Sequence, residues 1–180
     1  LLLAEMRAAF GSKYMITVAS QAAEKNWKNM NLAKSSPHVD AWHVMTYDYT
    51  VSDVQGSNVT APNAPLYAPK SYPGESADWS IDYTVQGYLK AGVEPSKIHV
   101  GIPYYGHTWY APGQPSKSWQ KFGLPAQQQG ACCGPFKNTY GAKYGKASQQ
   151  CGTLMYNEIQ ESNPKVYYDS TTESALGYFE

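Results

Sequence analysis

The stretch VDAWHVMTYD, residues 39–48, decides the fold of this chain. Apolar side chains run along it up to a polar end formed by Thr46, Tyr47 and Asp48. A short run of this kind, rich in residues that favour extended backbone, is typical of a β-strand. We therefore predict a strand here whose last residues carry functional side chains.

Two further stretches, one on each side of it, have the composition of strands. Residues 14–20, YMITVAS, are short, apolar and rich in β-branched residues, so we predict a strand buried on both faces. Residues 98–106, IHVGIPYYG, follow a turn at residues 95–97 and predict a third strand.

Helical patterns separate these strands. Residues 1–10 repeat apolar side chains at intervals of three and four before Gly11, and residues 81–91 place apolar side chains on one helical face before Gly92. A glycine directly after such a pattern is a common end of a helix. Residues 21–34 are mixed in character, and the pattern there leaves both a loop and a helix open.

Helices that alternate with strands predict a parallel sheet with helical crossovers, and the pattern alone is compatible with both a closed barrel and an open sheet. Residues 51–77 are rich in proline and glycine and are too long for a mere connection, as is typical of loops that line sites. From residue 112 onward the composition changes. Five apolar and aromatic residues predict short antiparallel strands in an inserted subdomain: Leu154, Tyr156, Val166, Tyr167 and Tyr168.

The charge balance of the chain excludes some classes of partner. Its 180 residues hold 14 Lys and Arg and 14 Asp and Glu, so the formal net charge is zero. A neutral chain has no general attraction for nucleic acid phosphates or for an anionic membrane surface. No run approaches the roughly 20 apolar residues of a membrane-spanning helix. Aromatic residues make up 14% of the chain, and their flat faces suit sugar rings as well as strand-rich cores.

The 3 cysteines, Cys132, Cys133 and Cys151, lie in a stretch rich in glycine and tyrosine. Their spacing has none of the paired patterns of zinc sites, so we predict no metal. We expect a disulfide between Cys151 and one of the other two, with the third pairing outside this chain; free cysteines in a cytosolic protein are the alternative. A glycosylation sequon at residues 58–60 fits the oxidising route, and we predict a secreted protein.

In their order along the chain, four blocks of sequence resemble chitinases of glycoside hydrolase family 18. The first is VMTYD at residues 44–48, with the loop NAPLY at residues 63–67 beyond it. The others are the helix at residues 81–92, the strand at residues 97–106 with its GIPYYG ending, and CGTLMYNEI at residues 151–159. Blocks in this order are far more specific than any one of them, and the resemblance runs from the first helix to the end of the chain.

The resemblance implies an α/β fold, namely part of a (β/α)8 TIM barrel. Residues 1–111 would supply about strands five to seven of the catalytic barrel, and residues 112–180 would form an incomplete α+β subdomain that many members insert after the seventh strand. In such barrels the site lies at the carboxyl ends of the strands. The family's acidic motif, which carries the catalytic Glu at the end of the fourth strand, does not occur in this sequence. We expect that Glu upstream of Leu1, and these 180 residues alone to be inactive.

The resemblance also implies roles for individual residues. As catalytic residues, Tyr47 would hydrogen-bond the acetamido carbonyl of the substrate, and Asp48 would bind sugar hydroxyls and stabilise a positive intermediate. Met45 would line the pocket for the acetamido methyl group, and Tyr105 would contact the neighbouring sugar.

Beyond the third strand, this chain departs from the family pattern. The family usually has Arg two residues after Tyr105, where this chain has His107. A histidine can donate a hydrogen bond to Asp48, but it lacks the forked geometry of a guanidinium group, so the pH range of activity is expected to differ.

Trp109, like Tyr110 and Trp119, would offer an aromatic face on which a sugar ring can stack.

The implied reaction is hydrolysis of β-1,4-linked N-acetylglucosamine polymers by substrate-assisted, retaining catalysis, without a cofactor. The expected partners are chitin or its oligosaccharides, with no nucleic acid and no membrane, and we expect a monomer. One alternative is a chitinase-like lectin that binds chitin oligosaccharides without hydrolysing them. Hydrolysis of another N-acetylglucosamine polymer, such as peptidoglycan, also stays open.

Overall fold

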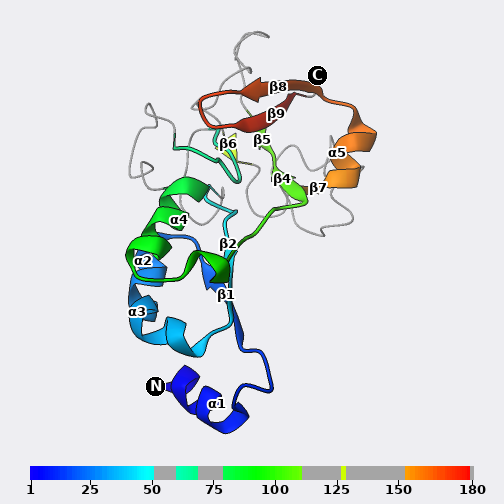
Figure 1. Cartoon of the computed structure of the whole chain (residues 1–180). Coiled ribbons are helices and arrows are strands. Elements are labelled where there is room, and N and C mark those ends of the chain that lie inside the picture. Colours follow the sequence, from blue (N-terminus) through cyan, green and yellow to red (C-terminus); the bar gives the residue numbers. More distant parts are fainter. Residues whose placement is uncertain (51–59, 69–78, 111–126, 129–152, 179–180) are drawn as a thin grey trace.

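The computed structural model of the chain describes residues 1–50, 60–68, 79–110, 127–128 and 153–178 (Figure 1). Within these residues no helix has the length and apolar character needed to cross a bilayer. In chain order the elements are α1 (Leu2–Phe10), β1 (Thr17–Gln21), α2 (Glu24–Trp27), η1 (Lys28–Met30), α3 (Leu32–Ser35), η2 (Ser36–His38), β2 (Ala41–Met45), α4 (Ile81–Lys90), η4 (Pro95–Lys97), β3 (Ile98–Val100), β4 (Tyr105–His107), β5 (Trp109–Tyr110), β6 (Gln127–Gln128), β7 (Thr153–Met155), α5 (Tyr156–Ser162), β8 (Lys165–Asp169) and β9 (Ser174–Tyr178).

A 3-stranded parallel sheet, in the order β1-β2-β3, carries the first part of the chain. In the register of β1 and β2, Thr17 lies opposite Ala41, and in that of β2 and β3, Trp42 lies opposite Ile98. Figure 1 shows the helices α2, α3 and α4 on one side of these strands. The parallel sheet with helical crossovers that the sequence predicts is therefore confirmed.

Aromatic side chains form the core between the sheet and the helices. Trp42 of β2 is fully buried, and its ring lies edge-on to that of Tyr88 of α4, with 6.3 Å between the centroids. The ring of Trp27 in α2 lies 5.8 Å from the same Tyr88 ring. Gly87 allows this contact, because a Cβ atom there would lie 2.6 Å from the Trp27 ring. Burial of these large rings is a main stabilising contribution.

The two predicted helices are confirmed, and each is followed by its glycine. Gly11 after α1 has φ 61°, and Gly92 after α4 has φ 87°, a left-handed backbone that glycine adopts without strain. The helix α4 begins after Ser80, whose Oγ accepts a hydrogen bond from the N–H of Tyr83 at 3.2 Å. Residues 21–34, where the pattern left both a loop and a helix open, contain the short helices α2 and η1 and the start of α3.

The prediction that the first strand is buried on both faces is wrong. β1 begins only at Thr17. Tyr14 and Met15, which were predicted to belong to it, lie exposed in the connection before it. Within the described residues, the helices cover only one face of the sheet, and Ser20 points into that covered side with no exposure. The exposed side chains of the sheet include Thr17, Ala19, Gln21, His43 and His99.

The predicted third strand is in fact two strands. β3 ends at Val100, whereas β4 pairs antiparallel with β7. Pro103, between them, has no amide hydrogen for a ladder. The N–H of Gly101 still donates to the carbonyl of Val44 at 2.9 Å, and Thr46 Oγ1 donates to the carbonyl of Gly101 at 2.8 Å. The strand predicted over residues 39–48 is likewise shorter and ends at Met45.

Short antiparallel pairs and the helix α5 lie in the other half of the molecule (Figure 1). The pairs are β4 with β7, β5 with β6, and β8 with β9. Leu154 in β7 and Val166, Tyr167 and Tyr168 in β8 are confirmed as strand residues. Tyr156 is not, because it begins α5, where the Glu158 carboxylate accepts the N–H of Met155 at 2.9 Å. The predicted boundary at residues 111–112 lies outside the described residues and stays a prediction.

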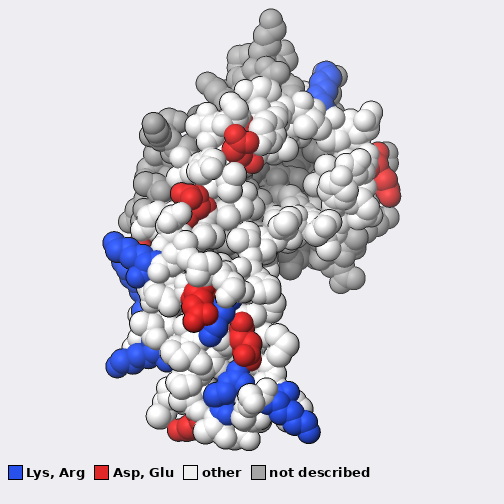
Figure 2. Space-filling view, in the orientation of Figure 1, with Lys and Arg blue, Asp and Glu red and all other residues white. Residues whose placement is uncertain are grey.

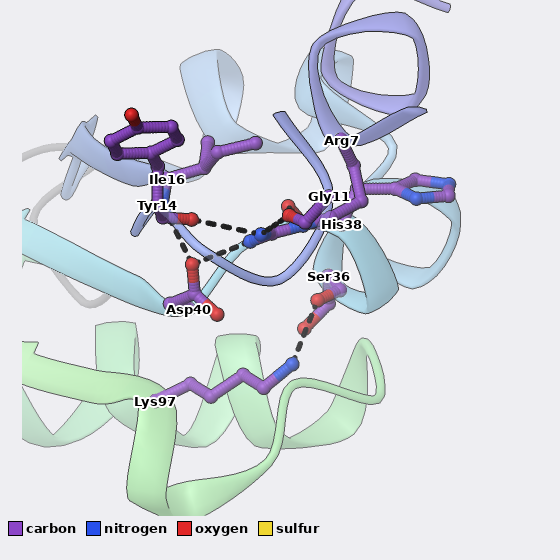
Figure 3. Close-up of polar contacts among 8 residues, drawn as sticks. All are labelled: Arg7, Gly11, Tyr14, Ile16, Ser36, His38, Asp40 and Lys97. Atoms are coloured by element: carbon purple, nitrogen blue, oxygen red, sulfur yellow. Dashed lines mark hydrogen bonds and ion pairs between the residues drawn. The ribbon is translucent and has the colours of Figure 1, made fainter. Parts of the chain in front are cut away.

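Arg7 ties α1 to the beginning of the sheet (Figure 3). Its Nη2 lies 2.5 Å from Asp40 Oδ2, which also accepts the N–H of Ile16 at 2.6 Å. These two groups, the Ile16 amide first, lower the pKa of Asp40 below its ordinary value of 3.8. The remaining N–H groups of Arg7 donate to the carbonyls of Gly11, Tyr14 and His38.

Replacing Arg7 with alanine in the complete protein is expected to lower the melting temperature by a few degrees at pH 7. The pKa of Asp40 is lowered on folding. Its contribution to the stability of the fold is therefore present above pH 3.8 and is lost as the pH falls through the lower pKa of the folded state. The difference between Arg7→Ala and the unmodified protein should therefore narrow in acid. Thermal melts from pH 7 down to pH 3 measure it, with the exposed Lys34→Ala as the control for loss of a cation. An equal difference at every pH would contradict the role given to the ion pair.

Candidate active site

The carboxylate of Asp48 joins the ends of two strands. Its Oδ1 accepts hydrogen bonds from the hydroxyl of Tyr105 and from Nε2 of His107, each at 2.8 Å. A carboxylate only accepts hydrogen bonds, so His107 must carry its proton on Nε2 here. The end of β2 and the strand β4, 57 residues apart at Asp48 and Tyr105, thus meet at a single oxygen atom.

The same contacts set the charges of the site. Partial burial acts to raise the pKa of Asp48, but the hydrogen bonds from His107 and Tyr105 outweigh it and lower that pKa below 3.8. Burial first, and donation to Asp48 second, raise the pKa of the Tyr105 phenol well above its ordinary 10.0. At neutral pH Asp48 is therefore ionised while Tyr105 keeps its proton. The His107 side chain is only 10% exposed against 43% for Asp48, so Asp48 presents the accessible part of the cluster.

Tyr47 lies beside this cluster. Its half-buried ring stands edge-on to the Tyr105 ring, with 6.0 Å between the centroids. Gly101 makes room for it, because a Cβ atom at that position would lie 2.8 Å from Cε1 of Tyr47 and 2.7 Å from the carbonyl of Val44. Gly101, the first glycine of the GIPYYG block, is needed because Val44 and Tyr47 approach its Cα too closely for a side chain.

The structure brings together four of the residues predicted for the site: Tyr47, Asp48, Tyr105 and His107. Met45 is half-buried at the end of β2, opposite Gln21 of β1. Trp109 is half-buried in β5, one strand beyond the cluster. The roles given to these residues stay predictions. Trp119, the side chain of Tyr110 and the cysteines Cys132, Cys133 and Cys151 lie outside the described part of the chain.

The sequence analysis missed the part played by Asn63. Its Oδ1 accepts the backbone N–H of Asp48 at 2.7 Å, and its Nδ2 donates to the backbone carbonyl of Tyr105 at 3.1 Å. Its own carbonyl accepts the N–H of Tyr49 at 3.1 Å. Asn63 begins the NAPLY block, which resembles the family, so the sequence did mark this position. No functional role was predicted for it.

The loop that holds Asn63, residues 60–68, also contacts the elements around it. The carbonyl of Pro65 accepts the N–H of Ile81 at the start of α4 at 2.9 Å. The N–H of Leu66 donates at 2.9 Å to the carbonyl of Thr172, a fully buried residue in the turn between β8 and β9. One loop thus fixes the site against both halves of the molecule.

A cavity of about 420 Å³ adjoins the cluster. Asn63, Tyr105 and His107 form part of its polar side, whereas Leu154, Ile159 and Leu176 contribute apolar surface. Such a mixture suits an amphipathic ring. On the face shown in Figure 2, most of the Lys and Arg side chains lie over the half that contains the sheet, and the charged side chains visible over the other half are mainly Asp and Glu. This surface is poorly matched to an anionic polymer.

No group of three or more His, Cys, Asp or Glu side chains that could hold a metal ion occurs among the residues with a described position. The chemistry that the cluster itself offers is that of an ionised carboxylate, a protonated phenol and an imidazole in mutual contact. These groups can orient a polar ligand and stabilise a positive charge next to Asp48.

A carboxylate and aromatic side chains thus lie together where the chain leaves β2 and enters β4, an arrangement that can contact an amphipathic ring. The sequence model of "Glycosyl hydrolases family 18" matches residues 1–179. The chain belongs to glycoside hydrolase family 18, as the sequence blocks predicted, and its α/β fold class is confirmed.

Chitinases are among its relatives. Chitinase A1 of Niallia circulans is 36% identical over 103 residues, which cover 55% of this chain and 14% of that protein. Endochitinase 1 of Metarhizium robertsii is 29% identical over 174 residues, which cover 94% of this chain and 36% of that protein. The chain therefore spans about a third or less of the length of these curated relatives.

Solved structures share the fold along nearly the whole chain. The Group IV chitinase of Ostrinia furnacalis superposes with a TM-score of 0.74 at 26% identity, covering 99% of this chain and 46% of that one. Human YKL-39, described as a pseudo-chitinase with retained chitooligosaccharide binding, superposes with a TM-score of 0.76 at 21% identity and covers 99% and 48% of the two chains. The latter likeness concerns the fold alone.

Proposed function

We propose that this chain is part of a chitinase that hydrolyses β-1,4-linked N-acetylglucosamine polymers by substrate-assisted, retaining catalysis. The observation that carries the proposal is the Asp48 carboxylate, kept ionised by Tyr105 and His107 beside the Tyr47 ring, in a chain of family 18. The Group IV chitinase of Ostrinia furnacalis, 26% identical to this chain, has also been solved in complex with allosamidin, which supports a ligand-binding role for this chain.

In this reaction the acetamido carbonyl of the substrate attacks the anomeric carbon while an acid protonates the leaving oxygen, and water later opens the cyclic intermediate. The Tyr47 hydroxyl would donate to that carbonyl and keep it in line for attack. The ionised Asp48 would lie next to the positive charge that develops. Met45 would contact the acetamido methyl group, and Tyr105 and Trp109 would contact neighbouring sugars.

The acid would be a Glu upstream of Leu1 in the complete protein, because the family's acidic motif is absent from these 180 residues. These residues alone would then be inactive. Residues 1–111 would supply strands five to seven of the barrel, and residues 112–180 the inserted subdomain. We further infer a secreted, monomeric protein without cofactor or metal; the secretion rests on the cysteines and the sequon of the sequence.

The decisive experiment uses the complete protein. Release of short oligosaccharides from chitin is measured beside release from peptidoglycan, and binding of chitooligosaccharides is measured by calorimetry. Selective hydrolysis of chitin supports the proposal. Binding without hydrolysis would replace it with the lectin reading, whereas neither binding nor hydrolysis would refute both.

His107 is expected to set the acid side of the pH profile. Because its hydrogen bond helps to lower the pKa of Asp48, His107→Ala should move the acid limb of kcat/KM to higher pH and reduce kcat/KM about tenfold at neutral pH. His107→Arg, which restores a donor and a permanent charge, should return the limb to the original pH or below it. pH profiles of the two variants test this, and an unchanged limb in His107→Ala would contradict it.

A further inference from the structure

We propose that Asn63 is a positioning residue that fixes the Asp48 carboxylate relative to Tyr105. The inference rests on the proposed function, because it concerns the same site. It assigns to the loop at residues 60–68 a part in the reaction, although Asn63 reaches the site only through backbone groups.

Asp48 needs support from outside the sheet. Its backbone has φ 57°, in the left-handed region that non-glycine residues adopt at a cost. It also lies beyond the last ladder residue of β2, Met45, so the sheet itself does not hold it. Asn63 contacts the two peptide groups that flank Asp48. Its Oδ1 accepts the N–H of Asp48, and its backbone carbonyl accepts the N–H of Tyr49.

The contacts of Asn63, Asp48 and Tyr105 close a ring. From the Asp48 carboxylate the ring passes to the hydroxyl of Tyr105, at 2.8 Å, and through that residue to its carbonyl. The carbonyl accepts from Nδ2 of Asn63 at 3.1 Å, and Oδ1 of Asn63 returns to the N–H of Asp48 at 2.7 Å. No ladder joins β2 to β4 among the described residues, so this ring and the His107 hydrogen bond are what link Asp48 to β4 there.

The ring restricts which side chain can stand at position 63. The ring needs an acceptor toward the N–H of Asp48 and a donor toward the carbonyl of Tyr105 on one short side chain, which is what a carboxamide provides. Aspartate of the same size can accept but cannot donate, and its charge would oppose ionisation of Asp48. Alanine can do neither. The requirement is therefore specific for asparagine rather than for a small polar residue.

The experiment compares Asn63→Ala, Asn63→Asp and the control Asn29→Ala in the complete protein. Asn29 is matched because its Nδ2 also donates to a backbone carbonyl, that of Lys25 at 2.9 Å. Asn29 lies exposed in the short helix η1, away from the site. The readouts are kcat/KM on chitooligosaccharides, its acid limb, the melting temperature, and hydrogen exchange of residues 46–50. That segment contains the amides of Asp48 and Tyr49.

We expect Asn63→Ala to lower kcat/KM on the order of 10²-fold, because small misplacement of reacting groups has effects of that size, and to move the acid limb to higher pH. Exchange of the Asp48 amide should accelerate about tenfold. Asn63→Asp should keep the Asp48 amide protected, because a carboxylate still accepts its N–H. The added negative charge should also move the acid limb of kcat/KM to higher pH. Asn29→Ala should match the unmodified protein in all readouts.

Folded variants whose exchange at Asp48 and whose acid limb equal those of the unmodified protein would overturn the proposal. If Asn63→Ala lacks a cooperative melt, Asn63→Asp decides by kcat/KM at neutral pH, where Asp48 stays ionised. The lost donor to the carbonyl of Tyr105 should lower it, and an unchanged value would overturn the proposal. If the unmodified protein hydrolyses no chitooligosaccharide, the proposed function fails, whereas exchange of the Asp48 amide in Asn63→Ala still decides whether Asn63 fixes it.

Discussion

Asp48→Asn in the complete protein is expected to lower kcat/KM for chitooligosaccharides by about 10²–10³-fold, the size seen when a preorganised electrostatic group is removed from an active site. The amide has the size of the carboxylate and can still accept from Tyr105 and His107, so the cluster should keep its shape. The lost quantity is the negative charge beside the developing positive charge of the sugar.

The pH profile makes this prediction specific. Because the pKa of Asp48 is lowered below 3.8, activity that needs the ionised form should persist below that pH and be lost only as the pH falls through the lower value. In Asp48→Asn this acid limb should disappear. Initial rates across the acid range measure it, with the exposed Asp82→Asn on α4 as the control for loss of an acidic side chain. Turnover within about twofold of the unmodified protein would refute the electrostatic role.

The sequence was sufficient wherever local chemistry determines the structure. The helices α1 and α4 are recognisable because Gly11 and Gly92 directly follow apolar repeats and adopt a left-handed backbone. The parallel order of β1, β2 and β3 follows from helical crossovers between them. Tyr47 and Asp48, at the polar end of an apolar run, could be assigned to a strand end before any contact was known.

The features that could not be predicted depend on contacts distant in the sequence. The break between β3 and β4 arises where β4 pairs with β7, whose partner residues lie about 50 positions further along the chain. Exposure of His43 and His99 depends on which face the helices cover. The contacts of Asn63 depend on a loop whose path is fixed by α4 and by Thr172, so the NAPLY block could mark this residue but could not show its partners.

Tyr47→Phe is expected to lower kcat on the order of 10²-fold while KM changes little, because the hydroxyl would orient the acetamido carbonyl mainly as it attacks. Phenylalanine keeps the edge-on contact with Tyr105 and the fit against Gly101, so the fold of the site should be unaffected. The measurement is steady-state kinetics on chitooligosaccharides together with their calorimetric binding.

The matched control is Tyr104→Phe. It removes the hydroxyl of the tyrosine that precedes Tyr105 in the sequence and that is 75% exposed. A fall in kcat with binding retained in Tyr47→Phe, and no change in Tyr104→Phe, would tie the reaction to orientation of the substrate's own nucleophile. The opposite result, unchanged turnover in Tyr47→Phe, would leave the ring contact with Tyr105 as a structural feature and would remove substrate assistance through this hydroxyl from the mechanism. The two results differ because the hydroxyl is the only group that the substitution removes.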